Sequence, residues 1–237
     1  MFKNLITSAV FAGFGAGLIA ALLHVWLVAP VILEAELYED GIKVHYGTVM
    51  PDHTDNSSAH ADEGHGNGSA ERSLFSRHGQ SVLWTLGTYL GFALVMVAGF
   101  AMAQRAGISV NARTGLIWGA AGYVAFYLLP SAGLPPELPG SSAAELQARQ
   151  IWQVFVTAAS VIGIASIAFG KNWMVWGAGI AIMALPHITG APMTHDYGGV
   201  TPPELAAHFA SLTLAVGIVA WLALGLIAGF FWQRSST

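Results

Sequence analysis

Six runs of apolar residues, separated by polar links, account for most of this chain of 237 residues. A helix needs about 20 mostly apolar residues to cross the hydrocarbon core of a bilayer. The runs that meet or approach this length are 5–33, 83–103, 114–130, 151–169, 173–185 and 209–232. No strict alternation of apolar and polar residues indicates a barrel, so each run is expected to be a transmembrane helix. The sequence therefore predicts an all-α, polytopic membrane helical bundle, with 1–237 as a single membrane domain.

The number of spans depends on the run 173–185, which is the shortest. We expect about six transmembrane helices, with five as the alternative. The first run is far longer than the roughly 7–15 apolar residues of a signal peptide, so we interpret it as a retained span. Close helix packing is favoured by four Gly-x-x-x-Gly patterns, which are Gly13–Gly17, Gly87–Gly91, Gly115–Gly119 and Gly225–Gly229.

Composition excludes several classes of function. Only 9% of the residues are charged, against about 25% in an ordinary soluble protein, so no part of the chain is expected to be a soluble enzyme domain. The absence of cysteine excludes disulfides and thiolate chemistry. No basic patch indicates nucleic-acid binding, and no phosphate-binding loop or hydrolase motif is present. We therefore expect a protein that is not an enzyme.

Charge is distributed unevenly across the predicted spans. The N-terminus, the links 104–113 and 170–172 and the C-terminus carry five basic residues and no acidic one. The opposite side carries all thirteen acidic residues and four basic ones, which gives a net charge of −9 against +5. Because basic residues in short loops mark the cytoplasmic side, we expect a multi-pass protein of the bacterial inner membrane with both termini in the cytoplasm.

Histidines and carboxylates gather on the predicted outer side. Residues 34–81 form a long polar outer loop, of which the low-complexity segment 52–69 is expected to be disordered. Imidazole and carboxylate are the ligands of first-row divalent metals where thiolate is absent. The loop candidates for metal capture are His53, Asp55, His60, Asp62, Glu63 and His65. The alternative is a solvated acidic loop or a pH-sensitive linker that binds no metal.

A second set of candidates surrounds the segment 186–208. If these side chains converge with the outer end of the first span, they form an outward-facing metal-entry site; the set is His24, Glu34, His187, His195, Asp196, Glu204 and His208. Pro186 and His187 are expected to end the fifth span. Thr201 is predicted to be the N-cap of the last helix, with Glu204 in the capping-box position. Glu204 could therefore also serve only as a cap. His208 could be its partner in a helical hydrogen bond, and His24 could make an interhelical one.

Several segments together resemble the CbtA family of predicted cobalt transporter subunits. They are the opening MFKNLITSAVFAGFGAGLIAALLHVWLVAPVILEAELYEDG, the His/Asp-rich loop, PHITGAP, and HDYGGVTPPELAAHF. The resemblance implies cobalt uptake for cobalamin synthesis, beside a small, single-span, histidine-containing partner called CbtB. It also implies about five spans, against the six counted from the apolar runs.

The resulting expectation is a transporter subunit for a divalent transition metal, most simply cobalt. Cobalt, nickel or zinc would be the transported ion, with no permanently bound cofactor, since His/carboxylate sites discriminate these metals mainly by geometry. Two other classes stay open: a metal-binding accessory or sensor membrane protein that transports nothing, and a membrane enzyme with a His/Glu metal site at its outer face. The sequence does not decide between a channel and an ion-coupled carrier.

Overall fold

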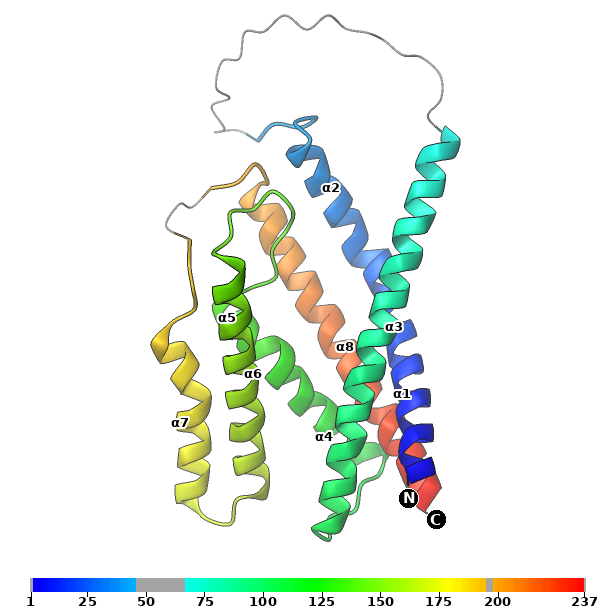
Figure 1. Ribbon diagram of the computed structural model, residues 1–237, viewed down its shortest axis with the longest axis vertical. Coiled ribbons are helices and arrows are strands. Elements are labelled where there is room, and N and C mark those ends of the chain that lie inside the picture. Colours follow the sequence, from blue (N-terminus) through cyan, green and yellow to red (C-terminus); the bar gives the residue numbers. More distant parts are fainter. Residues whose placement is uncertain (1, 46–66, 195–197, 237) are drawn as a thin grey trace, which may run out of the picture.

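The computed structural model describes residues 2–45, 67–194 and 198–236, and within them the chain is helical apart from its links. The elements run α1 Phe2–Leu23, η1 His24–Val28, α2 Ala29–Glu39, α3 Asn67–Arg105, α4 Ala112–Tyr123, η2 Val124–Leu128, α5 Leu129–Gly133, α6 Leu146–Phe169, α7 Trp173–Thr189 and α8 Pro203–Ser236. Figure 1 shows a bundle of antiparallel helices with no sheet in the described residues. The predicted all-α class is confirmed.

Five of these helical stretches are long and apolar enough to cross a membrane. They are Leu5–Glu39, Gly79–Arg105, Ala112–Gly133, Leu146–Phe169 and Pro203–Arg234. The sixth apolar helix, α7, has 17 residues, which at 1.5 Å per residue gives a length of about 26 Å. It returns antiparallel to α6, so that both ends of the chain lie at the same end of the bundle (Figure 1).

The two ends of the bundle differ in what they carry. The links 106–111 and 170–172 lie beside the termini, and we call this the termini end (Figure 1). The end of α2, the start of α3, the link 134–145 and the residues just before α8 lie at the opposite end, which we call the loop end. This arrangement agrees with the pairing of links that the charge distribution predicts.

The helices extend beyond the predicted spans. The predicted polar loop 34–81 is helical at both margins, because α2 continues to Glu39 and α3 begins at Asn67. Residues 67–69, expected to be disordered, therefore belong to a helix, while 46–66 lie outside the described residues. The prediction that Pro186 and His187 end the fifth span is wrong: α7 continues to Thr189, and its last turn is closed by hydrogen bonds from the backbone N–H of Gly190 and the Thr189 hydroxyl to the Pro186 carbonyl.

Two spans contain a π-helical turn directly before a proline. In η1 the N–H of Ala29 donates to the carbonyl of His24, and in η2 the N–H of Leu129 donates to the carbonyl of Val124, each five residues back. The next residue is Pro30 or Pro130, which has no N–H to continue the ordinary ladder. The wider turn accommodates this loss, so the third span does not end at Pro130 as predicted but continues to Gly133.

Glycine faces bring the central helices into backbone contact. A Cβ atom at Gly115 or Gly119 of α4 would collide with the carbonyl oxygens of Gly225 and Trp221 of α8. The Gly13–Gly17 face of α1 packs in the same way on α3, where a Cβ at Gly13 would lie 2.7 Å from the Cα of Leu90. Close backbone approach through small residues is a common basis of helix association in lipid.

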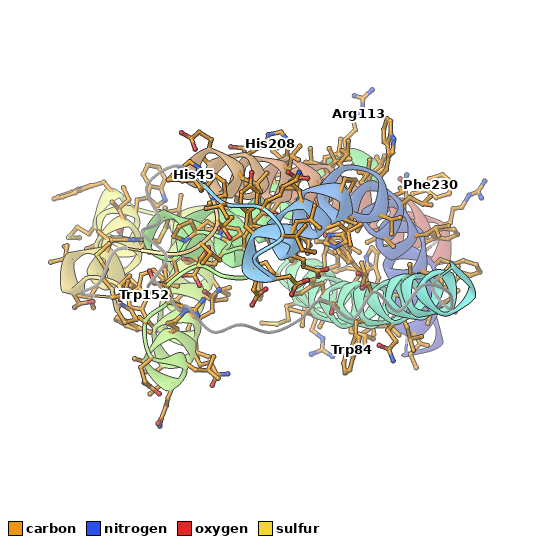
Figure 2. All side chains as sticks on the ribbon, turned by 90° about the horizontal axis from the view of Figure 1, so that it is seen from above. His45, Trp84, Arg113, Trp152, His208 and Phe230 are labelled. Atoms are coloured by element: carbon orange, nitrogen blue, oxygen red, sulfur yellow. The ribbon has the colours of Figure 1, made fainter. Side chains whose placement is uncertain are left out.

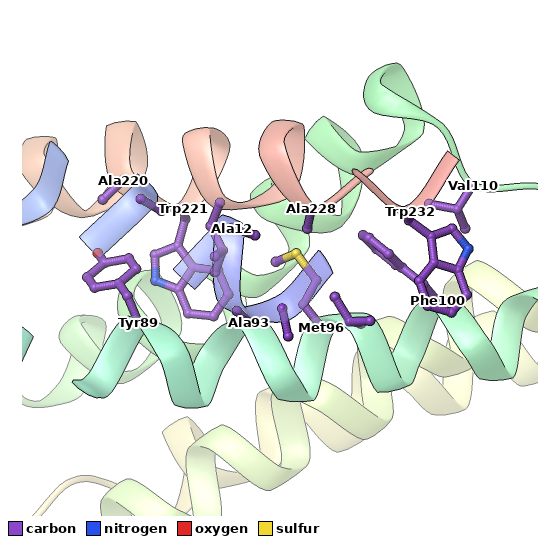
Figure 3. Packing of buried hydrophobic residues seen from close by; sticks show 14 of the residues in the cluster. Ala12, Tyr89, Ala93, Met96, Phe100, Val110, Ala220, Trp221, Ala228 and Trp232 are labelled. Atoms are coloured by element: carbon purple, nitrogen blue, oxygen red, sulfur yellow. The ribbon is translucent and has the colours of Figure 1, made fainter. Parts of the chain in front are cut away.

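Aromatic side chains fill the space beside these contacts. Phe100 of α3 lies with its ring centroid 5.3 Å from that of Trp118 and 6.1 Å from that of Trp232. Trp221 is 2% exposed, and its ring centroid lies 4.7 Å from that of Phe92. Figure 3 shows this row of buried residues between α3 and α8. The core therefore fixes α1, α3, α4 and α8 as one unit and leaves the polar candidates at the loop end.

Candidate metal-entry region at the loop end

The first span places two candidate ligands on its loop-end half. His24 is the first residue of η1 and is half-buried, and Glu34 lies on α2, also half-buried. The ammonium of Lys43 donates to Oε1 of Glu34 over 2.6 Å. This hydrogen bond to a carboxylate raises the pKa of the Lys43 ammonium. Glu34 thus already has a cationic partner, which a metal ion would have to displace.

The start of α8 is anchored to the link before α6. Gly199 forms an isolated antiparallel bridge with Ser141. The hydroxyl of Thr201 donates to the carbonyl of Pro139 over 2.8 Å, and the helix begins at Pro203. The prediction that Thr201 is the N-cap of this helix is wrong, because the helix begins at Pro203 and the residue directly before it is Pro202. The prediction of a capping box with Glu204 is therefore wrong as well. A proline, Pro203, does occupy the first helical position.

Glu204 and His208 lie one helical turn apart and are both exposed. The opposite face of the same turns is apolar: Leu205 and Phe209 belong to a cluster with Val31 and Ala35 of α2. The structure thus brings α2 and α8 side by side through their apolar faces. Glu204 and His208 remain on the accessible side, where His208 is labelled in the view onto the loop end (Figure 2).

His187 lies near the loop end of α7, in a different environment. Its Nε2 atom is enclosed and has no hydrogen-bond partner in the described residues. Its ring meets that of Trp152 edge-on at 5.9 Å, while the indole N–H of Trp152 donates to the carbonyl of Pro186 over 3.3 Å. Figure 2 shows Trp152 apart from His45 and His208.

The described candidates do not form an assembled metal site. No group of three or more His, Asp or Glu side chains that could hold a metal ion occurs among the residues that the structure describes. That the candidate side chains of the metal-entry site converge around one ion therefore stays a prediction. Its members His195 and Asp196, and the loop-capture set His53, Asp55, His60, Asp62, Glu63 and His65, lie outside the described residues.

One polar cluster at the loop end was not anticipated from the sequence. Nη2 of Arg149 on α6 donates to Oε2 of Glu137 over 2.6 Å. This pair borders an open hollow of about 670 Å³ together with Gln150 and Gln153. The sequence offers one signal, since Arg149 is among the few basic residues on the acidic side. The twelve-residue separation from Glu137 matches no helical spacing that would predict the pair.

The termini end is complementary in charge. Arg105, Arg113 and Lys171 are exposed there, and Arg234 lies with its guanidinium carbon 4.7 Å from the ring centroid of Phe230. Every carboxylate in the described residues lies in or beside the helix ends and links of the loop end. In the described part of the chain, one end is therefore basic and the other carries the Asp and Glu residues together with His45, His187 and His208.

These features define a polytopic helical membrane protein with histidine and carboxylate side chains at one end of the bundle. A family model described as "Probable cobalt transporter subunit (CbtA)" matches residues 2–233, essentially the whole chain. The chain therefore belongs to the CbtA family, as the resemblance predicted. No curated protein and no solved structure matches the chain.

Proposed function

We propose that this chain is the membrane-embedded subunit of a cobalt uptake system that supplies cobalamin synthesis. The observation that carries the proposal is the separation of the two ends: metal-type ligands occupy the loop end, while the described termini end is basic. Membership of a family described as cobalt transporter subunits agrees with it. The loop end faces outward in the bacterial inner membrane, both termini are cytoplasmic, and the ion enters from the loop end.

Within this proposal, cobalt is cargo and the chain holds no resident cofactor and catalyses no reaction. The entry ligands are His24, Glu34, His187, His195, Asp196, Glu204 and His208, which meet only transiently around a passing ion. Exposed Glu204 and His208 supply the first carboxylate and imidazole. A small single-span subunit of the CbtB type completes the system, since the family is described as a subunit.

The test is uptake of radiolabelled cobalt by cells that lack other cobalt importers. Cells carrying this chain with its small partner should accumulate cobalt above cells carrying neither, and unlabelled nickel or zinc in excess should show which metals compete. Equal accumulation in cells with and without the chain, with insertion of the chain into the membrane verified, would support the metal-binding accessory or sensor instead of transport. The same cells with the partner alone provide the control.

A further inference from the structure

The hollow beside Arg149 lies at the junction between the α6–α7 hairpin and the rest of the bundle. It is lined by residues of η2 and α5, by the link 134–137 and by the first turns of α6. α6 begins at the loop end, so the hollow lies where the apolar span meets the polar surface (Figure 1). If α6 crosses the bilayer, this end of the helix lies near the boundary between phospholipid headgroups and acyl chains.

The polar lining of the hollow consists mainly of hydrogen-bond donors. Arg149 has five N–H groups, and its ion pair with Glu137 engages Nη2. Its Nε is enclosed and has no acceptor in the described residues. Gln150 and Gln153 add two carboxamides beside it. The Glu137 carboxylate is already bonded to the guanidinium, so the cluster is better suited to an anionic group than to a divalent cation.

The remaining lining is apolar and extends along the span. Phe126 of η2, Leu134 of the link and Val154 of α6 face the same hollow as the guanidinium. A small soluble anion would use the donors and leave this apolar wall in contact with water or lipid. A phospholipid satisfies both parts, because it joins a phosphate diester to an acyl chain within one molecule.

We propose that this hollow binds a phospholipid of the leaflet at the loop end. The phosphate accepts hydrogen bonds from Arg149, with Gln150 and Gln153 as flanking donors, and an acyl chain lies along Phe126 and Val154. Tyr127 also lines the hollow, and its ring meets that of Trp221 of α8 edge-on, with the ring centroids 6.5 Å apart. A bound lipid therefore touches the residue that joins η2 to the central helices, and stabilises the attachment of the α6–α7 hairpin. This inference is independent of cobalt transport.

The test uses the full chain, purified in detergent, stripped of lipid and then titrated with phosphatidylglycerol. Native mass spectrometry measures the bound lipid, and thermal unfolding measures stabilisation. Arg149→Gln should weaken retention by about tenfold or more, as expected for loss of a charged hydrogen bond. Gln147→Ala is the matched control, since Gln147 is exposed on the same helix and does not line the hollow. It should bind as the unmodified chain does.

A second variant separates lipid recognition from loss of the ion pair. Glu137→Gln removes the same pair but leaves the guanidinium free, so it should retain lipid at least as well as the unmodified chain. Equal loss of lipid in Glu137→Gln and Arg149→Gln would overturn the proposal, because the pair would then be structural only. Unchanged retention in Arg149→Gln would overturn it as well. Millimolar inorganic phosphate that displaces the lipid and stabilises equally would identify a free-anion site instead and also refute it.

Discussion

At the scale of single residues, the start of α8 presents two exposed candidate ligands, a carboxylate and an imidazole. Glu204 and His208 are exposed on one turn of α8, and the nearby Thr201 hydroxyl is occupied by the Pro139 carbonyl. Because α8 begins at Pro203, Glu204 is its second residue and not the third, which a capping box requires. Its remaining structural role is an acidic group in the first turn, where a carboxylate stabilises a helix by about 0.3–1 kcal/mol.

A role in metal binding and a role in helix stability predict different results for substitutions at the start of α8. Changing Glu204 or His208 to alanine should abolish cobalt uptake while the amount of folded protein in the membrane stays the same, because the first ligands for the ion are lost. Uptake normalised to folded protein is the measurement. Ser211→Ala is the matched control, since Ser211 is exposed on the same helix and its hydroxyl bonds only the Ala207 carbonyl. Near-normal uptake in both variants would remove this segment from the metal path.

The Lys43–Glu34 pair gives a prediction for pH. Because the hydrogen bond to Glu34 raises the pKa of Lys43, its contribution to stability is complete below the ordinary lysine pKa of about 10.4. That contribution is lost as the pH rises through the higher folded value. Glu34→Gln should return the pKa toward the ordinary value, so Lys43 should be acetylated faster in the variant at about pH 10. Equal acetylation rates in the two proteins, followed by peptide mass spectrometry, would contradict the pairing.

At the scale of helices, the four Gly-x-x-x-Gly patterns turn out to be of two kinds. Three of them pack against another helix of this chain, whereas a Cβ at Gly87 or Gly91 of α3 would meet nothing within 4 Å. All four patterns read alike in the sequence. What distinguishes them is the rotation of each helix, which depends on the combined packing of Phe100, Trp221 and other large side chains.

Substitution of paired glycines tests this distinction. Gly119→Ala should destabilise the protein by about 1–3 kcal/mol, because the added methyl would overlap the Trp221 carbonyl and force α4 away from α8. Gly91→Ala should leave stability unchanged or slightly raised, since alanine is the better helix former by up to about 1 kcal/mol. Both are measured by thermal unfolding in the same detergent. Equal destabilisation by the two substitutions would mean that the α4–α8 contact does not hold the bundle together.

The sequence predicted the spans well and the polar detail poorly. Apolar runs locate helices because lipid demands internal hydrogen bonding, so every predicted run became a helix. The predicted helix boundaries were wrong at two prolines, Pro130 and Pro186, which both look like helix ends in the sequence. In the structure a π-helical turn precedes Pro130, and Pro186 lies within the last turn of α7. The Arg149–Glu137 pair and the Thr201 bond to Pro139 join elements distant in sequence, and no local pattern encodes them.

At the scale of the whole molecule, the topology depends on α7. This helix has 17 residues, fewer than any of the five candidate spans, and it returns the chain to the loop end before α8 (Figure 1). A reporter active only in the cytoplasm should work when fused after Thr237 and also when inserted at Lys171, because six crossings place both in the cytoplasm. Activity at Lys171 without activity at Thr237 would show that α7 does not cross and that five spans is correct.

The long connection between α2 and α3 provides the last prediction. Residues 52–66 contain the histidines and carboxylates of the loop-capture set and precede the start of α3 at Asn67. Deleting them should leave thermal stability almost unchanged, since the helices that form the bundle remain intact. Cobalt uptake should fall mainly at low external metal, because the segment raises the local ion concentration and is not part of the path. Uptake measured across a range of cobalt concentrations distinguishes this from a pore role: complete loss at saturating cobalt would contradict capture. Replacing the segment with a Gly/Ser linker of equal length controls for the shortened connection, and it should behave like the deletion.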